Sequence, residues 1–173
     1  MTRNVDLKSD CANCAALCCV VFAFDKSESF ALDKKAGEAC PNLTGAGKCS
    51  VFEDREKLGF RGCIAYDCFG AGQRVTQEVF KGKSWKDDIR LMTGMGEALS
   101  VLRRIHEQLV LLESAAKLPL TREERNRLRD LQATLAPEAD WTQANLNAFP
   151  LETNIKEVAT FLQGLRHHME RNH

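Results

Sequence analysis

Eight cysteines are the residues of this 173-residue chain best suited to do chemistry, and all of them precede residue 69. Clustered cysteines in a reducing compartment indicate metal or redox chemistry more often than disulfides. So many thiols in so short a stretch far exceed ordinary usage, so eight unrelated core residues are a poor explanation. The predicted metal ligands are Cys11, Cys14, Cys18, Cys19, Cys40, Cys49, Cys63 and Cys68.

The first four cysteines lie within nine residues, in the stretch DCANCAALCCVV. If residues 11–19 form a helix, Cys11, Cys14 and Cys18 share one face. Cys19 then points about 100° away from Cys18. One mononuclear site would not use both easily, so either one of the two is a buried structural thiol or the pair serves two metals.

The last four cysteines come from later segments and would close the site from the other side. Structural zinc takes four ligands, and thiolates suit both zinc and iron–sulfur clusters. Eight thiols therefore allow two four-ligand sites, one shared cluster, or one site with spare thiols. Spacing alone does not choose among these.

The elements that must position the thiols fall into two regions with different composition. Residues 1–80 are rich in Cys, Gly and Phe, whereas residues 84–173 show helical periodicity. Apolar residues at three- and four-residue spacing predict a helix over 85–117, with a kink or break near Gly94 and Gly96. The predicted fold is mainly α: a small irregular cysteine-rich domain followed by a bundle of about three helices.

The remaining helices carry clear boundary signals. Thr121 and Glu124 form a capping box that begins a second helix. A helical turn is expected over 141–149, and the last helix begins near Pro150. Short connections favour antiparallel packing of these helices.

The first region has shorter elements. Ser9 or Asp10 is expected to begin the helix over 11–19, and CSVF and CIAYDCF read as β-like pieces. Gly70 and Gly72 are expected to turn the backbone after Cys68. Two residues between the closing cysteines, Tyr66 and Asp67, are candidates to support the ligands from outside, the alternative being a packed ring and a turn residue.

Composition argues against several partners. The chain has 24 basic and 24 acidic residues and no basic stripe, which argues against nucleic acid. The first residues, MTRNVDLKSDC, lack an apolar segment, and no run is long enough to span a membrane. We therefore expect a cytoplasmic protein. The helical tail is expected to be the surface for a homodimer or another protein.

The histidines are weaker candidates. A neutral surface or core role is expected for His106. Adventitious metal binding is open to His167, His168 and His173, but a frayed, solvated chain end is the stronger expectation for them.

The cysteine pattern is similar to the YkgJ-type cysteine-cluster family, whose domain is described as zinc- or iron-chelating. This resemblance rests on the stretches CANCAALCC, CPNLTGAGKCSVFEDR and CIAYDC. FALDKKAGEACPNL and GFRGCIAYDCFGAGQRVTQ resemble more closely the cysteine-rich domain ahead of pentapeptide repeats in actinobacterial proteins. The resemblance covers about residues 10–80. The usual Arg-Pro before the seventh cysteine is absent, and residues after 80 contain no such repeats, so their role does not carry over.

The resemblance implies a metal and little mechanism. We expect a metal-binding protein that holds Zn²⁺, with iron or a [4Fe–4S] cluster as the alternative. Related clusters occur in flagellin N-methylase-like proteins, which suggests methyl transfer or redox chemistry. No independent catalytic residues accompany the cysteines, so the sequence assigns no reaction. A third hypothesis is storage or sensing of soft ions such as Cu(I).

Overall fold

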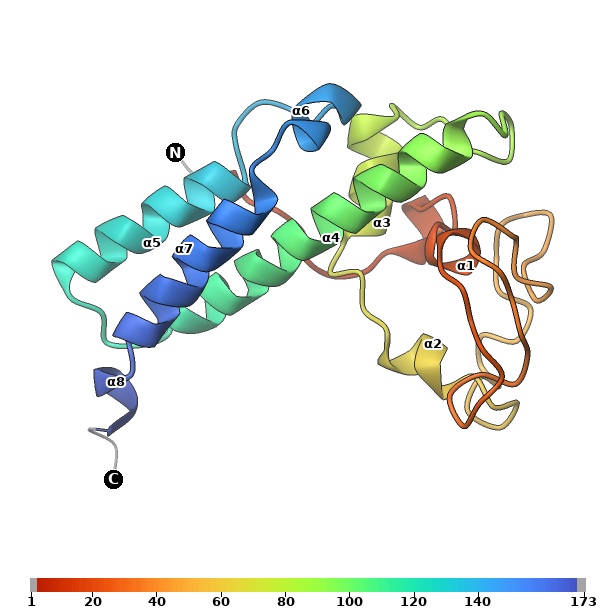
Figure 1. Cartoon of the computed structure of the whole chain (residues 1–173), viewed down its shortest axis with the longest axis horizontal. Coiled ribbons are helices and arrows are strands. Elements are labelled where there is room, and N and C mark those ends of the chain that lie inside the picture. Colours follow the sequence, from red (N-terminus) through yellow and green to blue (C-terminus); the bar gives the residue numbers. More distant parts are fainter. Residues whose placement is uncertain (1–2, 171–173) are drawn as a thin grey trace.

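A computed structural model describes residues 3–170, and it is mainly helical, as predicted. Figure 1 shows an elongated molecule with long helices at one end and loops with short helices at the other. The helices are α1 (Cys18–Val21), α2 (Arg61–Ala65), α3 (Ala71–Arg74), α4 (Leu91–Ala115), α5 (Arg122–Leu135), α6 (Gln143–Asn147), α7 (Leu151–Gly164) and α8 (His167–Glu170). A 3₁₀ turn (Cys11–Asn13) precedes α1, and a π-helical turn (Val75–Val79) continues α3.

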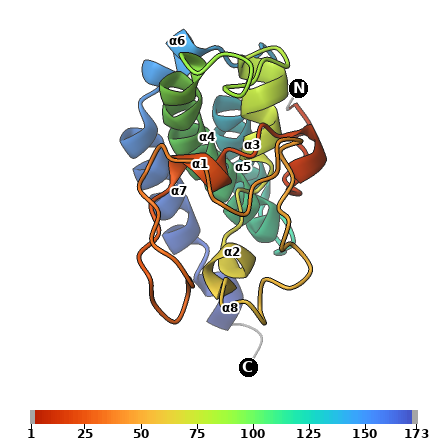
Figure 2. The same cartoon turned by 90° about the vertical axis from the view of Figure 1, so that its right-hand side faces the viewer.

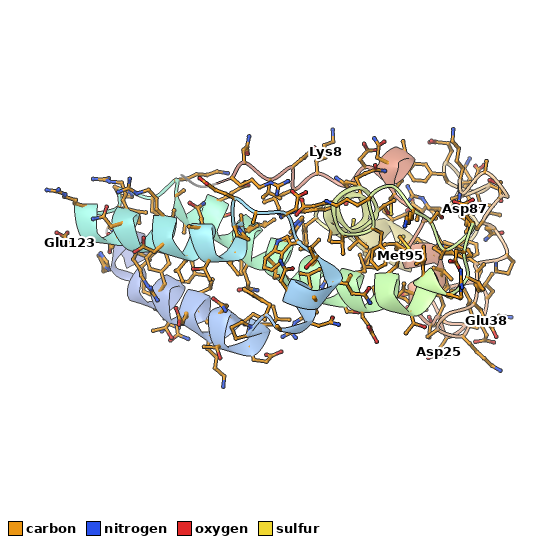
Figure 3. The ribbon with its side chains drawn as sticks, turned by 90° about the horizontal axis from the view of Figure 1, so that it is seen from above. Lys8, Asp25, Glu38, Asp87, Met95 and Glu123 are labelled. Carbon is orange, nitrogen blue, oxygen red and sulfur yellow. The ribbon has the colours of Figure 1, made fainter. Side chains whose placement is uncertain are left out.

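Three long helices, α4, α5 and α7, form the bundle predicted from apolar periodicity. Each of them packs on the other two. Helix α4 is its spine, and its apolar stripe, including Met95, Leu102 and Ile105, is completely buried. Figure 3 places Met95 along α4 between the two ends of the molecule.

Local signals explain where the bundle helices begin and end. The predicted capping box begins α5: the Thr121 hydroxyl accepts from the Glu124 amide, and the Glu124 carboxylate accepts from the Thr121 amide at 2.7 Å. A second capping box, at Thr142 and Asn145, begins α6. Pro150 is the residue that caps α7.

Helix α4 differs from the prediction at its start. It begins at Leu91, not near Trp85, because the Asp88 side chain accepts from the Arg90 amide and holds a turn there. The predicted kink near the glycines is also wrong, since α4 runs unbroken from Leu91 to Ala115. Instead, Gly94 allows close approach: a Cβ there would lie 2.4 Å from the Gln143 side chain.

We call residues 9–69 the cysteine lobe. Figure 2 views the molecule from that end, with α1, α2 and the loops in front of the bundle. Two isolated antiparallel bridges, Phe24 with Lys34 and Leu43 with Cys49, are its β-type pairings. The lobe is not separate from the bundle, because Ala15 and Leu17 belong to the same buried cluster as the residues of α4.

The predicted helix over 11–19 is wrong. Asp10 caps as expected, accepting from the Ala12 amide, but it begins only a 3₁₀ turn. Cys14 is extended, and Ala16 has a φ of 55°, so the backbone reverses before α1 begins at Cys18. The β-like assignment of CIAYDCF is also wrong over its first residues, which belong to α2.

Candidate metal centre

The charge effects among the thiols group the eight cysteines loosely into two sets of four, and Cys19 links the sets, because its sulfur lies 4.0 Å from that of Cys18 and its charge also raises the pKa of Cys11. The first thiol set brings the start of the lobe together with its last cysteine. The charge of Cys68 raises the pKa of both Cys11 and Cys14, after the larger effect of burial. Cys11 and Cys14 in turn contribute to the raised pKa of Cys18. The first thiol set is therefore Cys11, Cys14, Cys18 and Cys68.

The second thiol set joins α1 to the loops. Cys63 has its pKa raised to about 11, first by burial and then by the charges of Cys19, Cys40 and Cys49. Cys40 has its own pKa raised by burial and by the same neighbours, Cys19 and Cys49. The second thiol set is therefore Cys19, Cys40, Cys49 and Cys63.

Backbone hydrogen bonds hold the second thiol set in place. The Cys40 amide donates to the Cys19 carbonyl at 2.9 Å, which ties the loop to α1. The Leu43 amide donates to the Cys40 carbonyl at 2.9 Å, and Leu43 also pairs with Cys49 in a β-bridge. At the other side, the Gly62 amide donates to the Ser29 carbonyl at 2.9 Å and anchors the residue before Cys63.

Cys18 and Cys19 are adjacent in α1 but fall in different thiol sets. Their sulfurs lie 4.0 Å apart. Either thiol can be the donor in this contact, so the two titrate as a coupled pair. The contact and the nearby cations Lys34 and Arg55 lower the pKa of Cys19, whereas the contact and burial raise the pKa of Cys18.

The first thiol set lies against a closely packed glycine, and a buried hydroxyl near it has no hydrogen-bond partner. Gly72 packs against two of its sulfurs, and a Cβ at that position would lie 2.8 Å from Cys14 Sγ and 3.6 Å from Cys68 Sγ. The buried hydroxyl of Tyr66 has no hydrogen-bond partner, which is rare in folded proteins. Burial raises its pKa, followed by the charges of Cys18 and Cys68, so the hydroxyl remains a proton donor. An orphaned buried donor whose pKa responds to the charges of Cys18 and Cys68 fits a thiolate–metal centre.

Two further side chains surround Cys68. The Ser9 hydroxyl lies 3.1 Å from the Cys68 sulfur and 2.5 Å from Asp67 Oδ1. Asp67 also accepts from the Phe69 amide at 2.7 Å, which fixes the turn after Cys68. Gly70, with a φ of 78°, then begins α3 as the predicted turn glycine.

Cationic side chains accompany the second thiol set. Lys34 is only 5 % exposed, and its amine donates to the carbonyls of Val20, Lys35 and Glu38 at 3.2, 3.1 and 2.8 Å. Burial lowers its pKa, while the nearby charges of Cys40 and Cys19 raise it. A four-thiolate centre around a divalent ion has a net charge of about −2, so a neighbouring ammonium stabilises it. The donor set, its charge and its surroundings fit such an ion.

The sulfurs are more widely spaced than in a closed four-thiolate zinc site. In residues 3–170, Glu124, His167 and His168 are the one group of metal-binding side chains whose ligand atoms all lie within 4.8 Å of one another. A tetrahedral zinc ion with Zn–S bonds of about 2.3 Å holds its sulfurs about 3.8 Å apart. The thiol sets must contract to bind one ion each, and all eight thiols are free to do so, since none forms a disulfide.

One group near the thiols was not predicted from the sequence. Lys34 is buried, although a lysine among charged residues is expected to be exposed. Arg55 belongs to the stretch CPNLTGAGKCSVFEDR, stacks 3.7 Å from the Phe52 ring centroid, and lowers the pKa of a cysteine in each thiol set. The frayed chain end predicted for His168 is wrong: this side chain is buried against α5. His173 lies outside the described residues.

The chain is similar to a curated protein named "Uncharacterized protein YybG", from Bacillus subtilis (strain 168). The two are 39 % identical over 126 residues, which is 73 % of this chain. The chain spans 45 % of the length of that relative. No family model and no solved structure matches the chain. Across the described residues, no helix has both the length and the apolar character needed to cross a membrane.

Proposed function

We propose that the chain is a cytoplasmic metal-binding protein in which the two thiol sets each hold one zinc ion. The proposal rests on the mutual charge effects of the eight thiols, which group them into two sets of four, the ligand number of structural zinc. The orphaned Tyr66 hydroxyl and the close packing of Gly72 support a centre at the first set. The charge of Lys34 supports one at the second.

The metal would have a structural task. The cysteine lobe consists of short helices, turns and two isolated bridges, and few of its side chains belong to the buried core. Metal ligation supplies the folding free energy that such a small, loop-rich unit lacks. Free thiols throughout the lobe are in keeping with a reducing compartment.

A four-iron cluster at one or both thiol sets is the second candidate. It is favoured by the wide spacing of the sulfurs, because cysteines that bind different irons of a [4Fe–4S] cluster stay farther apart than those on one zinc ion. This centre would bring redox or methyl-transfer chemistry within reach.

Elemental analysis of untagged, anaerobically purified protein, combined with an absorption spectrum, tests both candidates. The zinc proposal predicts a colourless protein with about two thiol-bound zinc ions per chain and a melting temperature that chelator lowers. The iron–sulfur candidate predicts a brown protein with broad absorbance near about 400 nm. A metal-free protein whose melting temperature chelator leaves unchanged would contradict both.

A further inference from the structure

A second group of ligand side chains lies far from the thiols. Helix α8 follows the end of α7, at the end of the molecule opposite the cysteine lobe (Figure 1), and its His168 ring contacts Glu124 in the first turn of α5. In Figure 3, Glu123 marks the start of α5 at one end, whereas Asp25 and Glu38 of the lobe lie at the other. Beside Glu123, the carboxylate of Glu124 meets the rings of His167 and His168.

The three side chains converge at distances suited to one ion. His168 Nε2 lies 2.9 Å from Glu124 Oε2, and His167 Nε2 lies 3.3 Å from Glu124 Oε1. All three ligand atoms fall within 4.8 Å of one another. Nitrogen and oxygen ligands at about 2.0–2.1 Å from a tetrahedral zinc ion lie about 3.3 Å apart. Little movement is therefore needed to enclose an ion.

Hydrogen bonds orient two of the three candidate ligands, His167 and Glu124. His167 Nδ1 lies 2.9 Å from the Gly164 carbonyl. A carbonyl only accepts, so Nδ1 carries a proton, which leaves Nε2, on the side of the carboxylate, as the ligand atom of this ring. Histidine ligands of metals are typically oriented in this way. Glu124 is oriented by the capping box, through the Thr121 amide.

A divalent cation between His167 Nε2 and Glu124 Oε1 would be bound by both atoms, in the place that a proton takes in an ion pair. The side chains of His168 and Glu124 are 6 % and 18 % exposed, whereas that of His167 is 50 % exposed, so the site opens to solvent on the His167 side. One carboxylate and two neutral imidazoles match the ligand set of three-protein-ligand zinc sites, in which water takes the fourth position.

We propose that Glu124, His167 and His168 form a binding site for a divalent transition-metal ion of the zinc type. The bound ion fastens α8 to the first turn of α5. This site uses nitrogen and oxygen ligands and shares no residue with the thiol sets, so it stands independently of the function proposed for them.

Cobalt(II) is the probe that distinguishes this site from the thiols, because cobalt bound to thiolates has intense sulfur-to-metal charge-transfer absorption and cobalt bound to His and Glu does not. The full chain, without any histidine tag, is first saturated with zinc and freed of excess ion, and any ion at the new site is removed with a mild chelator. We expect one further equivalent of cobalt to bind without charge-transfer bands.

Matched variants locate the binding. Glu124→Gln keeps the capping box, in which Gln also serves, but removes the charged ligand. This variant and His167→Gln should weaken cobalt binding by more than about 100-fold, since loss of a ligand exceeds the 10–100-fold effect of losing a supporting residue. His173→Ala is the control and should bind as wild type does.

The outcomes separate cleanly. Equal cobalt binding by wild type and Glu124→Gln would overturn the proposal, and so would equal weakening in His173→Ala, which would mark adventitious binding by the chain end. Circular dichroism in chelator checks that the variants fold. Unaltered helicity with lost cobalt binding supports the site even if the thiols bind no metal at all.

Discussion

The guanidinium of Arg74 donates to the imidazole of His106, with Arg74 Nη1 3.2 Å from His106 Nε2. The other ring nitrogen, Nδ1, lies 2.5 Å from the Phe69 carbonyl and donates to it. The ring is fully buried in α4. His106 therefore connects the residue that follows Cys68 to the spine of the bundle, and it does so as a neutral side chain.

His106 should resist protonation. Burial, with the charge of Arg74, lowers the pKa of His106 to about 4. The unfolded chain binds the proton first as pH falls, so the stabilisation is present above pH about 6.5 and is lost as pH falls toward about 4. The loss is on the order of 3 kcal/mol.

Histidine NMR signals check this prediction. The resonance that disappears in His106→Gln should keep its neutral chemical shift from pH 8 down to about pH 5, unlike that of an ordinary histidine. A midpoint near the ordinary value would contradict the buried, neutral assignment.

Cysteine variants should reveal two centres rather than one. Made in a Glu124→Gln background that removes the other proposed site, Cys14→Ser and Cys40→Ser each remove a ligand from a different thiol set, so each should lower the metal content from about two ions per chain to about one. The double variant should lose both ions, as measured by elemental analysis after dialysis. Cys14→Ser with Cys68→Ser, both from the first set, is the matched control and should still retain one. Equal losses in the two double variants would argue for one shared cluster.

Gly72→Ala should impair the first thiol set alone. Its Cβ would lie 2.8 Å from Cys14 Sγ, a separation that requires the sulfur to shift. We expect the ion at the first set to be lost and the ion at the second to remain. Gly45→Ala, whose Cβ would meet nothing within 4 Å, is the control. Full metal content in Gly72→Ala would show that Cys14 does not ligate.

Tyr66→Phe should act in opposite directions on the two states of the protein. In the metal-free protein it removes a buried hydroxyl without a partner, so the free energy of unfolding should rise by about 1 kcal/mol. In the metal-loaded protein it removes a donor to the thiolates, and affinity should fall by about 10-fold or more. Urea unfolding and competition with a chromophoric chelator measure the two effects. A drop in metal-free stability would contradict this role of the hydroxyl.

The bundle was predictable from sequence because its helices follow ordinary rules. Periodic leucines mark the buried faces, and the Thr121 capping box marks the start of α5. The cysteine lobe was not, because a left-handed residue, Ala16, interrupts what reads as a helix. The pairing of Glu124 with His168 was equally hidden, because 44 positions separate the two residues.

The candidate ligands were predictable as a list but not as two sets. Helical spacing predicted that Cys18 and Cys19 point about 100° apart, but the helix on which that prediction rested does not extend back to Cys11, and the two sulfurs lie 4.0 Å apart. Which later cysteine joins which set depends on loop hydrogen bonds such as that of the Cys40 amide with the Cys19 carbonyl. No periodicity in the sequence encodes these bonds.

The adjacency of Cys18 and Cys19 limits how this sequence can vary. One peptide bond in α1 separates the thiol sets, so an inserted residue would rotate one sulfur by about 100° and draw it away from its partners. The loops that carry Cys40 and Cys49 tolerate changes in length far better, because loop closure depends only weakly on loop length. Homologous chains should therefore keep the CC dipeptide unbroken while the intervals between the later cysteines drift.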